Sequence, residues 1–298
     1  MMLPDWVYMY VSVSKEVITL EIMNQTGLQM RYINGQCYEF ILPNGKHLIT
    51  DPYVTPTKGL SNAGFRAFSV EEIERADYIL ITHSHFDHTS DLGYLAKKFG
   101  SMVFAGSMTI ALMAEFFDLD YGKLFPVSEM QTFELEDFTL TCYKGKHFAT
   151  KPMLRERSMK ITQKKFGVEG YGEIDTLGVV ETFDFCITFS NNLRLQFVSG
   201  DSVLNNPYTV AQSFRPNILI RHSMGGWDPT YYASLIAKFH AQVAFPMHHD
   251  NILAGKYSRT MDEFSSGVEQ ALYDIGSNTR FVNPEPYRWY TLSMQLVI

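Results

Sequence analysis

The sequence predicts an α+β fold in which two β-sheets pack face to face and helices cover their outer sides. Three observations support this prediction. Short strand patterns separated by turn residues open the first half of the chain. In each half a buried strand is followed by a segment of helical periodicity. Histidines come directly after several of these strands, so we expect a polar edge on a two-sheet core.

The first half begins with a β-meander. Residues 28–35 and 37–42 have the composition of two strands. Asn44 and Gly45 predict a two-residue hairpin turn leading into residues 47–53. This pattern starts after residue 24, so we expect an N-terminal extension over residues 1–24 and a single domain of two β/α halves over residues 25–298. The extension would add either an edge strand or a subunit contact in a homo-oligomer.

After residue 77 the pattern changes from consecutive strands to strands that are each followed by a helix. Residues 78–82 (YILIT) predict a buried strand, and residues 102–106 predict another. Each is followed by apolar residues at helical spacing, namely Leu92, Leu95, Ala96 and Phe99 in the first helix and Ile110, Met113, Ala114 and Phe117 in the second. Gly100 predicts the end of the first helix. The stretch between the first strand and its helix is therefore a loop.

The second half follows the same logic. A hairpin is expected from residues 184–190 and 193–201, and a further strand from residues 217–223. Asp228 and Pro229 predict the start of a helix, because aspartate caps helix N-termini and proline suits the first turn. The strand pattern that follows this helix ends in two histidines.

Composition excludes several classes of protein. A net charge of −7 argues against a general nucleic-acid binder, since affinity for phosphate backbones depends on lysine and arginine. The three cysteines, Cys37, Cys142 and Cys186, lack the spacing of a disulfide framework or a cysteine-bound zinc. No window approaches the length of a membrane span, and the N-terminus lacks the charge pattern of a signal peptide. We expect a soluble cytoplasmic protein.

The loop after residue 82 contains the strongest functional signal. His83, His85, Asp87 and His88 fall within six positions. Alternate residues of an extended segment point the same way, so His83 and His85 can hold one ion between them. Asp87 and His88 would face a neighbouring position. Imidazole and carboxylate suit zinc, iron or manganese, so we expect a metal site here.

This loop, THSHFDH, resembles the signature of the metallo-β-lactamase-fold hydrolases. The resemblance implies a four-layer αββα sandwich with a two-metal site along one edge. It also implies further ligands downstream, and the sequence offers His147 in KGKHFA, Asp201 in VSGDS and His248 in FPMHHDN. In the family pattern His83, His85 and His147 would bind the first metal, Asp87, His88 and His248 the second, and Asp201 both.

Two positions of the resemblance leave alternatives open. His249 competes with His248, which we prefer because the family places its ligand directly after the proline and one further residue. Asp51 in LITDPY matches a carboxylate that orients a metal-bound imidazole in relatives. The alternative for Asp51 is an aspartate that starts a turn before Pro52.

The resemblance also implies the chemistry. Two divalent cations, zinc by expectation with manganese or iron as alternatives, would hold a bridging hydroxide as the nucleophile. Asp87 and Asp201 would orient it. The leaving group needs an acid that the ligand motif does not supply, and His222 is a candidate. The alternative for His222 is a purely structural histidine.

Substrate preference is suggested by a basic segment from Lys144 to Lys165, which holds eight basic residues against the single acid Glu156. Arg155 and Arg157 in this segment could grip a phosphate or carboxylate, although a solvated loop is the alternative. Trp227 could line the pocket; the alternatives are that it anchors a helix to the core or lies at a dimer interface.

Among relatives, the branch that contains L-ascorbate-6-phosphate lactonase is most similar, through LITDPY, SGDS and MGGWDP. Gln36 departs from it, because that branch often carries histidine there. We therefore predict a binuclear metal-dependent hydrolase acting on a small anionic lactone or ester. The alternatives are a metal-dependent phosphodiesterase and a non-catalytic metal-binding sensing module.

Overall fold

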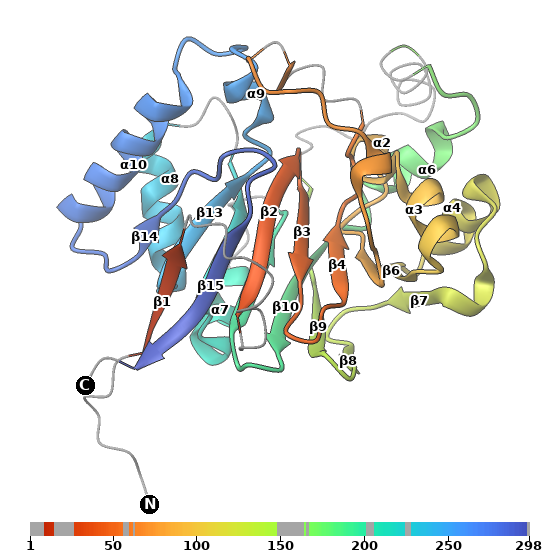
Figure 1. The fold of residues 1–298 in the computed structure, drawn as a ribbon, viewed down its shortest axis with the longest axis horizontal. Helices are drawn as coiled ribbons and strands as arrows, with labels where there is room; N and C mark the ends of the chain where they lie inside the picture. Colours follow the sequence, from red (N-terminus) through yellow and green to blue (C-terminus); the bar gives the residue numbers. More distant parts are fainter. Residues whose placement is uncertain are drawn as a thin grey trace, which may run out of the picture.

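Two sheets packed face to face, with helices on both outer sides, form the molecule (Figure 1). The computed structural model describes residues 9–14, 27–55, 60–61, 63–147, 164, 167–200, 206–223 and 228–296, with the backbone alone for residues 9–14 and 294–296. The four-layer αββα sandwich predicted from the sequence is confirmed.

The first sheet has the strand order β1-β15-β2-β3-β4-β5-β6-β7 within the described residues. Its strands are β1 (Met9–Ser14), β15 (Tyr290–Leu296), β2 (Leu28–Asn34), β3 (Cys37–Ile41), β4 (His47–Thr50), β5 (Tyr78–Leu80), β6 (Met102–Gly106) and β7 (Leu124–Val127). Neighbours from β4 to β7 are parallel, and the others are antiparallel. The carboxyl ends of β4, β5 and β6 therefore share one edge of the sheet.

The connection between β3 and β4 differs from the predicted two-residue turn. Leu42 N–H donates to Lys46 O at 2.8 Å, and Gly45 N–H donates to Leu42 O at 2.8 Å, so three residues close the hairpin. Gly45 has φ +81°, in the left-handed region. The glycine thus serves as the left-handed residue that follows the turn in a three-residue loop.

The second sheet has the order β14-β13-β12-β11-β10-β9-β8. Its strands are β8 (Thr132–Glu134), β9 (Phe138–Lys144), β10 (Phe183–Phe189), β11 (Arg194–Val198), β12 (Ile218–His222), β13 (Val243–Met247) and β14 (Arg280–Phe281). Strands β11 to β14 are parallel, while β8, β9, β10 and β11 pair antiparallel. Strands β9, β11, β12 and β13 consequently end at the same edge.

Helices complete the outer layers. On the first sheet lie α2 (Phe86–Thr89), α3 (Leu92–Phe99) and α4 (Ile110–Phe117), with α6 (Gly172–Leu177) beside them. On the second lie α7 (Asn206–Phe214), α8 (Pro229–Ile236), α9 (Asp250–Leu253) and α10 (Met261–Asp274). Short 3-10 helices span Val70–Glu72, Tyr121–Lys123 and Ala237–Phe239. Asp228 caps α8 through Thr230 N–H at 2.9 Å, as predicted.

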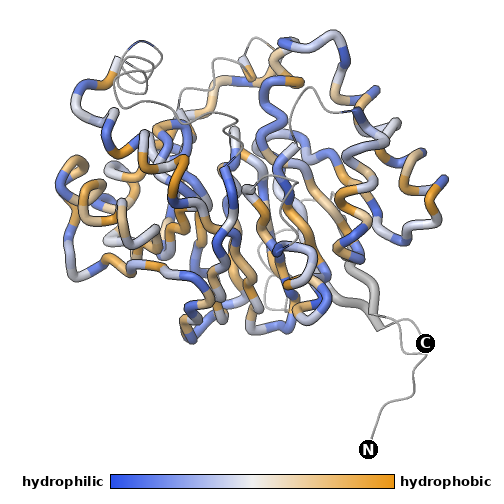
Figure 2. Tube along the Cα trace, turned by 180° about the vertical axis from the view of Figure 1, so that it is seen from behind, coloured by the Kyte–Doolittle hydropathy of each residue, from blue (hydrophilic) through white to orange (hydrophobic). Residues whose placement is uncertain are grey.

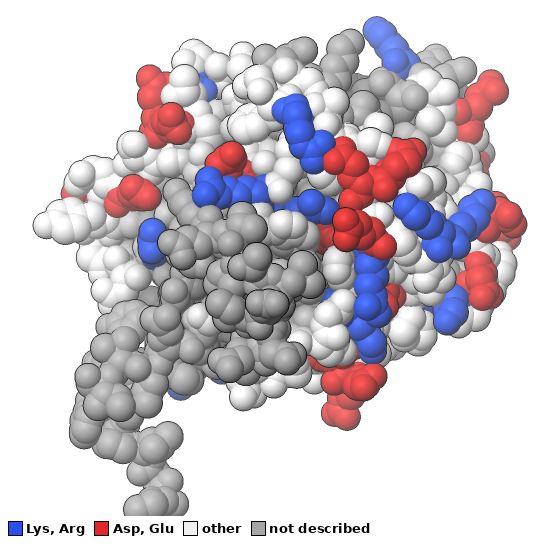
Figure 3. Space-filling view, viewed as in Figure 1, with Lys and Arg blue, Asp and Glu red and all other residues white. Residues whose placement is uncertain are grey.

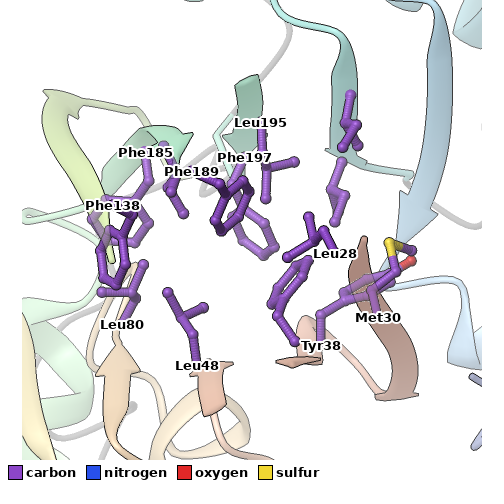
Figure 4. Close-up of a cluster of buried hydrophobic side chains, with 14 of the residues drawn as sticks. Leu28, Met30, Tyr38, Leu48, Leu80, Phe138, Phe185, Phe189, Leu195 and Phe197 are labelled. Atoms are coloured by element: carbon purple, nitrogen blue, oxygen red, sulfur yellow. The ribbon is translucent and has the colours of Figure 1, made fainter. Parts of the chain in front are cut away.

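Side-chain alternation along the strands builds three apolar layers. In β5, Tyr78 and Leu80 join the cluster between the sheets, whereas Ile79 joins the cluster under α3 and α4. The central cluster brings leucines of the first sheet against phenylalanines of the second (Figure 4). Hydrophobic stretches follow the strands, and many of the connecting turns are hydrophilic (Figure 2). This rigid double sheet fixes the edge where the functional residues lie.

Replacement of Phe197 by alanine should lower the free energy of unfolding by about 3–5 kcal/mol, since Phe197 is fully buried between the sheets. Denaturant titration of the variant measures this loss. Tyr273→Ala is the matched control, because that ring is 80% exposed and its removal should change stability by less than about 0.5 kcal/mol. Equal losses in both variants would contradict the packing described here.

Candidate metal centre

Six histidines form a continuous set of ring contacts at the edge where the strands end. They come from the loop after β5 and from α2, from the segment after β9, from the end of β12 and from the residue after β13. The ring-centroid distances are 4.7 Å for His83–His85, 3.8 Å for His83–His88, 4.9 Å for His83–His147, 4.4 Å for His85–His147, 5.5 Å for His88–His248 and 5.0 Å for His222–His248. Residues 165 positions apart in the chain thus meet in one cluster (248 minus 83).

His83, His85 and His147 are placed to share one metal ion. One nitrogen from each ring lies within 4.8 Å of the others. Nε2 of His83 is 3.2 Å from Nδ1 of His85. Two nitrogens that bind the same tetrahedral zinc at 2.0–2.1 Å would be about 3.4 Å apart. The spacing of this trio therefore suits a small divalent cation.

Burial keeps these imidazoles in the form that binds metals. It is the main reason why the pKa of His83 is well below its usual value, and the nearby His88 and His85 lower it further. Burial, with the neighbouring histidines His85 and His88, also lowers the pKa of His147 to about 3. Both rings are neutral at physiological pH. A neutral ring has a nitrogen lone pair available for a cation.

Asp51 holds both ends of the histidine loop, through Thr82 before it and His88 within α2. Its carboxylate accepts hydrogen bonds from Thr82 N–H at 2.7 Å and from the Thr82 hydroxyl at 2.7 Å, and it contacts Nδ1 of His88 at 3.0 Å. Asp51 has φ +39°, which directs its backbone into the site immediately after β4. The contact with Nδ1 leaves Nε2 of His88 for a metal ion. A carboxylate in this position can hold the His88 ring in one orientation.

Thr82 is a residue that the sequence analysis missed. Its hydroxyl, besides bonding Asp51, lies 3.0 Å from Nδ1 of His83. This contact holds the His83 ring with Nε2 facing His85. The position of Thr82 directly before the histidine motif was the available signal. Its importance depends on Asp51, which lies 31 residues away.

His248 and Asp87 lie next to His88, beside the trio of His83, His85 and His147. His248 has φ +60°, and its N–H donates to Gly35 O at 2.7 Å. Nδ1 of His248 is 3.2 Å from Oδ1 of Asp250. Oδ1 of Asp87 is 4.0 Å from Nε2 of His88. Asp87, His88 and His248 therefore gather next to the first trio, where a second ion was expected.

His249, the alternative to His248, occupies a different environment. It is fully buried, and its ring lies against Tyr32 with the centroids 4.2 Å apart. Burial lowers its pKa to about 3. Within the described residues, the ring contacts of the cluster reach His248 and not His249. The geometry favours His248 as the ligand.

His222 ends β12 beside His248. Burial lowers its pKa well below the usual value, with His248 as the next cause. The neighbouring Arg221 is also buried, and its guanidinium donates to the His222 carbonyl at 3.0 Å. His222 is therefore a neutral ring at the border of the cluster.

Helix α6 holds the histidine loop from outside. Asp175 accepts a hydrogen bond from Phe86 N–H at 2.9 Å, and the Ser84 hydroxyl donates to Ile174 O at 2.6 Å. The Tyr171 hydroxyl donates to Ser84 O at 3.0 Å. These contacts link positions nearly ninety residues apart, for which the sequence contains no local signal.

Four predicted site residues lie outside the described residues, namely Asp201, Arg155, Arg157 and Trp227. Of the basic segment, Lys144 and Lys146 are described and exposed, directly before His147. On the face drawn in Figure 3, basic and acidic side chains are intermingled.

The comparisons with known proteins agree with this architecture. A model of the beta-lactamase superfamily domain matches residues 47–167. A UPF0173 metal-dependent hydrolase of Staphylococcus aureus is 34% identical over 89 residues, which are 30% of this chain and 34% of that protein. The chain matches about a third of the length of such curated relatives.

Solved structures extend the likeness over most of the chain. A metallo hydrolase of the archaeon Ignicoccus hospitalis has a TM-score of 0.60 at 13% identity and covers 92% of this chain and 100% of its own. CmlA, a diiron beta-hydroxylase of Streptomyces venezuelae, has a TM-score of 0.55 at 11% identity, with 90% and 54% covered. The chain has the metallo-β-lactamase fold. Among the described helices, none has the length and apolar character needed to cross a membrane.

Substitution of Thr82 by valine should weaken zinc binding about tenfold, because it removes the hydroxyl that holds both Asp51 and His83 while keeping the shape of the side chain. Chelator competition measures the affinity. Thr82→Ser retains the hydroxyl and should bind zinc nearly as the unaltered protein does. Equal affinities for the valine and serine variants would show that the hydroxyl has no role in the centre.

Proposed function

We propose that this protein is a metal-dependent hydrolase that acts on a small anionic lactone or ester. The observation that carries the proposal is the convergence of six histidines at one sheet edge, with two ring nitrogens 3.2 Å apart. Relatives and structural neighbours that are named metal-dependent hydrolases support it.

The ligand set has two parts. His83, His85 and His147 would hold one divalent cation, and Asp87, His88 and His248 a second, with Asp201 between them. The donor set of imidazoles and carboxylates suits zinc, and also manganese or iron. When bound, such ions activate water for attack and neutralise the charge that develops on the substrate oxygen. The chain itself keeps His83 and His147 neutral through burial, and it orients the His83 and His88 rings through Thr82 and Asp51.

His222 is proposed to serve the leaving group. It is the one ring of the cluster without an expected metal, and it lies at the border next to His248. Because its pKa is lowered, the ring is neutral at physiological pH, and its N–H would donate a hydrogen bond that stabilises the charge developing on the leaving oxygen. Asp87, whose Oδ1 lies 4.0 Å from Nε2 of His88, would accept a hydrogen bond from the attacking water.

An anionic substrate is proposed from the charge beside the centre. Lys144 and Lys146 are exposed directly before His147, and Arg155 and Arg157 follow in the same basic segment. Positive charge at the mouth of a site raises the local concentration of anions. The most specific form of the proposal is a lactonase-like activity on a phosphorylated sugar acid, with a phosphodiester as the alternative substrate.

Elemental analysis of the purified protein should find about two divalent metal ions per chain, consistent with a two-metal hydrolytic site. His83→Ala and His248→Ala should each lower the content toward one, because each removes a ligand of a different ion. His240→Ala is the matched control. His240 is exposed before the start of β13, at the opposite edge of the sheet, and its loss should leave the metal content unchanged. A metal-free protein after reconstitution would refute the metal centre.

Assays on matched panels of phosphorylated lactones, neutral lactones and a simple phosphodiester should show turnover of the phosphorylated lactones. His222→Ala should lower kcat by about 10²–10⁴, more strongly for poorer leaving groups. Turnover of the phosphodiester alone would replace the lactonase proposal with the phosphodiesterase. A fully metal-loaded protein that hydrolyses neither class would indicate a sensing module.

A further inference from the structure

The first residues of β10 touch three segments that lead to proposed ligands. Phe183 N–H donates to Thr82 O at 2.8 Å, directly before His83. Gly145 N–H donates to Thr182 O at 2.8 Å, two residues before His147. A single short stretch of backbone thus joins the histidine loop of the first sheet to the end of β9 in the second.

Asp184 adds the third connection. Its Oδ1 accepts hydrogen bonds from Ser199 N–H at 2.9 Å and Gly200 N–H at 3.2 Å, and the Ser199 hydroxyl lies 3.4 Å from it. Gly200 directly precedes Asp201 in the chain. The carboxylate therefore fixes the backbone at the point where the chain leaves β11 for Asp201.

Two glycines let these segments pack directly on the carboxylate and on each other. A Cβ atom at Gly145 would lie 3.0 Å from Oδ1 of Asp184. A Cβ atom at Gly200 would lie 2.9 Å from the backbone nitrogen of Lys146. The segment before His147 and the segment before Asp201 are consequently in contact, with Asp184 against both.

Burial of the Asp184 carboxylate costs free energy, so its compensating contacts indicate a specific role for this residue. Its side chain is 3% exposed, and the buried guanidinium of Arg221 contributes a favourable charge. A buried carboxylate is destabilising unless donors and a counter-charge compensate it. Here the donors are the two backbone N–H groups of the Ser199–Gly200 turn.

We infer that Asp184 is a positioning residue that holds the Ser199–Gly200 turn against the segment before His147, and so fixes the backbone that leads to His147 and to the residue after Gly200. The inference rests on the proposed metal centre for its functional consequence. Its structural part, that Asp184 orders the Ser199–Gly200 turn, stands without any metal.

Two variants separate the parts of this role. Asp184→Ala removes the acceptor, whereas Asp184→Asn keeps an acceptor oxygen for the turn and removes the charge. Asp137→Asn is the control, because Asp137 is also a buried carboxylate with bonds to Tyr78 and Lys46. Asp137 lies before β9, roughly 20 Å from the end of that strand. The Asp137→Asn substitution should lower the stability of the fold without changing the geometry of the proposed metal centre.

The first measurement is amide hydrogen exchange of the metal-free protein. Asp184→Ala should speed exchange at Ser199 and Gly200 at least tenfold, with Asp184→Asn nearer to the unaltered protein and Asp137→Asn equal to it there. The second measurement is zinc affinity by chelator competition, which should fall 10- to 100-fold in Asp184→Ala, with partial recovery in Asp184→Asn.

Two results would overturn the inference, and a third would overturn the proposed metal centre. Unchanged exchange at the turn in Asp184→Ala overturns the inference, whatever the metal result. Altered exchange with zinc affinity reduced no more than in Asp137→Asn also overturns it, because Asp184 would then be structural only. If the unaltered protein binds no zinc, the proposed metal centre fails, and with it the functional part of the inference. Should Asp184→Ala not fold, the comparison of Asp184→Asn with Asp137→Asn decides by the same criteria.

Discussion

The arrangement of the site depends on the contacts that the Asp51 carboxylate makes with Thr82 and His88. The carboxylate stands at the end of β4, where a backbone with positive φ turns it toward the neighbouring strand. Without an acceptor in that place, the His88 ring and the Thr82 hydroxyl that contacts His83 would lose the partner that orients them. A single charged group, fully buried, thereby sets the directions of rings that belong to two different sides of the centre.

The sheet topology explains why so few residues are needed to build this centre. Strands β4, β5, β9, β12 and β13 all end at one edge, so few polar residues are needed there: the segment after β5 supplies four, and each of the other strand ends supplies one. The apolar alternation within each strand is left undisturbed. The polar residues of the site thus lie at the strand ends and the apolar residues of the core lie within the strands, so a change in one set leaves the other in place.

Much of this could be predicted from the sequence, where the signal was local. The strand before His83, the helix after it and the Asp228 cap follow from apolar period and capping chemistry over a few residues. The histidine motif was equally local. Gly45 was interpreted incorrectly, because an Asn-Gly pair suits both a two-residue turn and the three-residue loop that forms.

What the sequence could not reveal were contacts between distant segments. The support of the loop by Tyr171 and Asp175, and of the Ser199–Gly200 turn by Asp184, involves residues with ordinary local surroundings. A buried aspartate in a strand has no pattern of its own. Only the packing of one backbone against another, permitted by glycines, gives these side chains their partners.

The hydrogen bond from His248 to Gly35 carries a last consequence. It joins the hairpin between β2 and β3, near the start of the chain, to a ring that is contributed more than two hundred residues later. Contacts of such separation form late, since the loops that they close cost the most conformational entropy. A chain in which only β2 to β7 of the first sheet have formed would hold the histidine motif but not His248. His248 would then join the other rings of the histidine cluster only in the fully assembled chain.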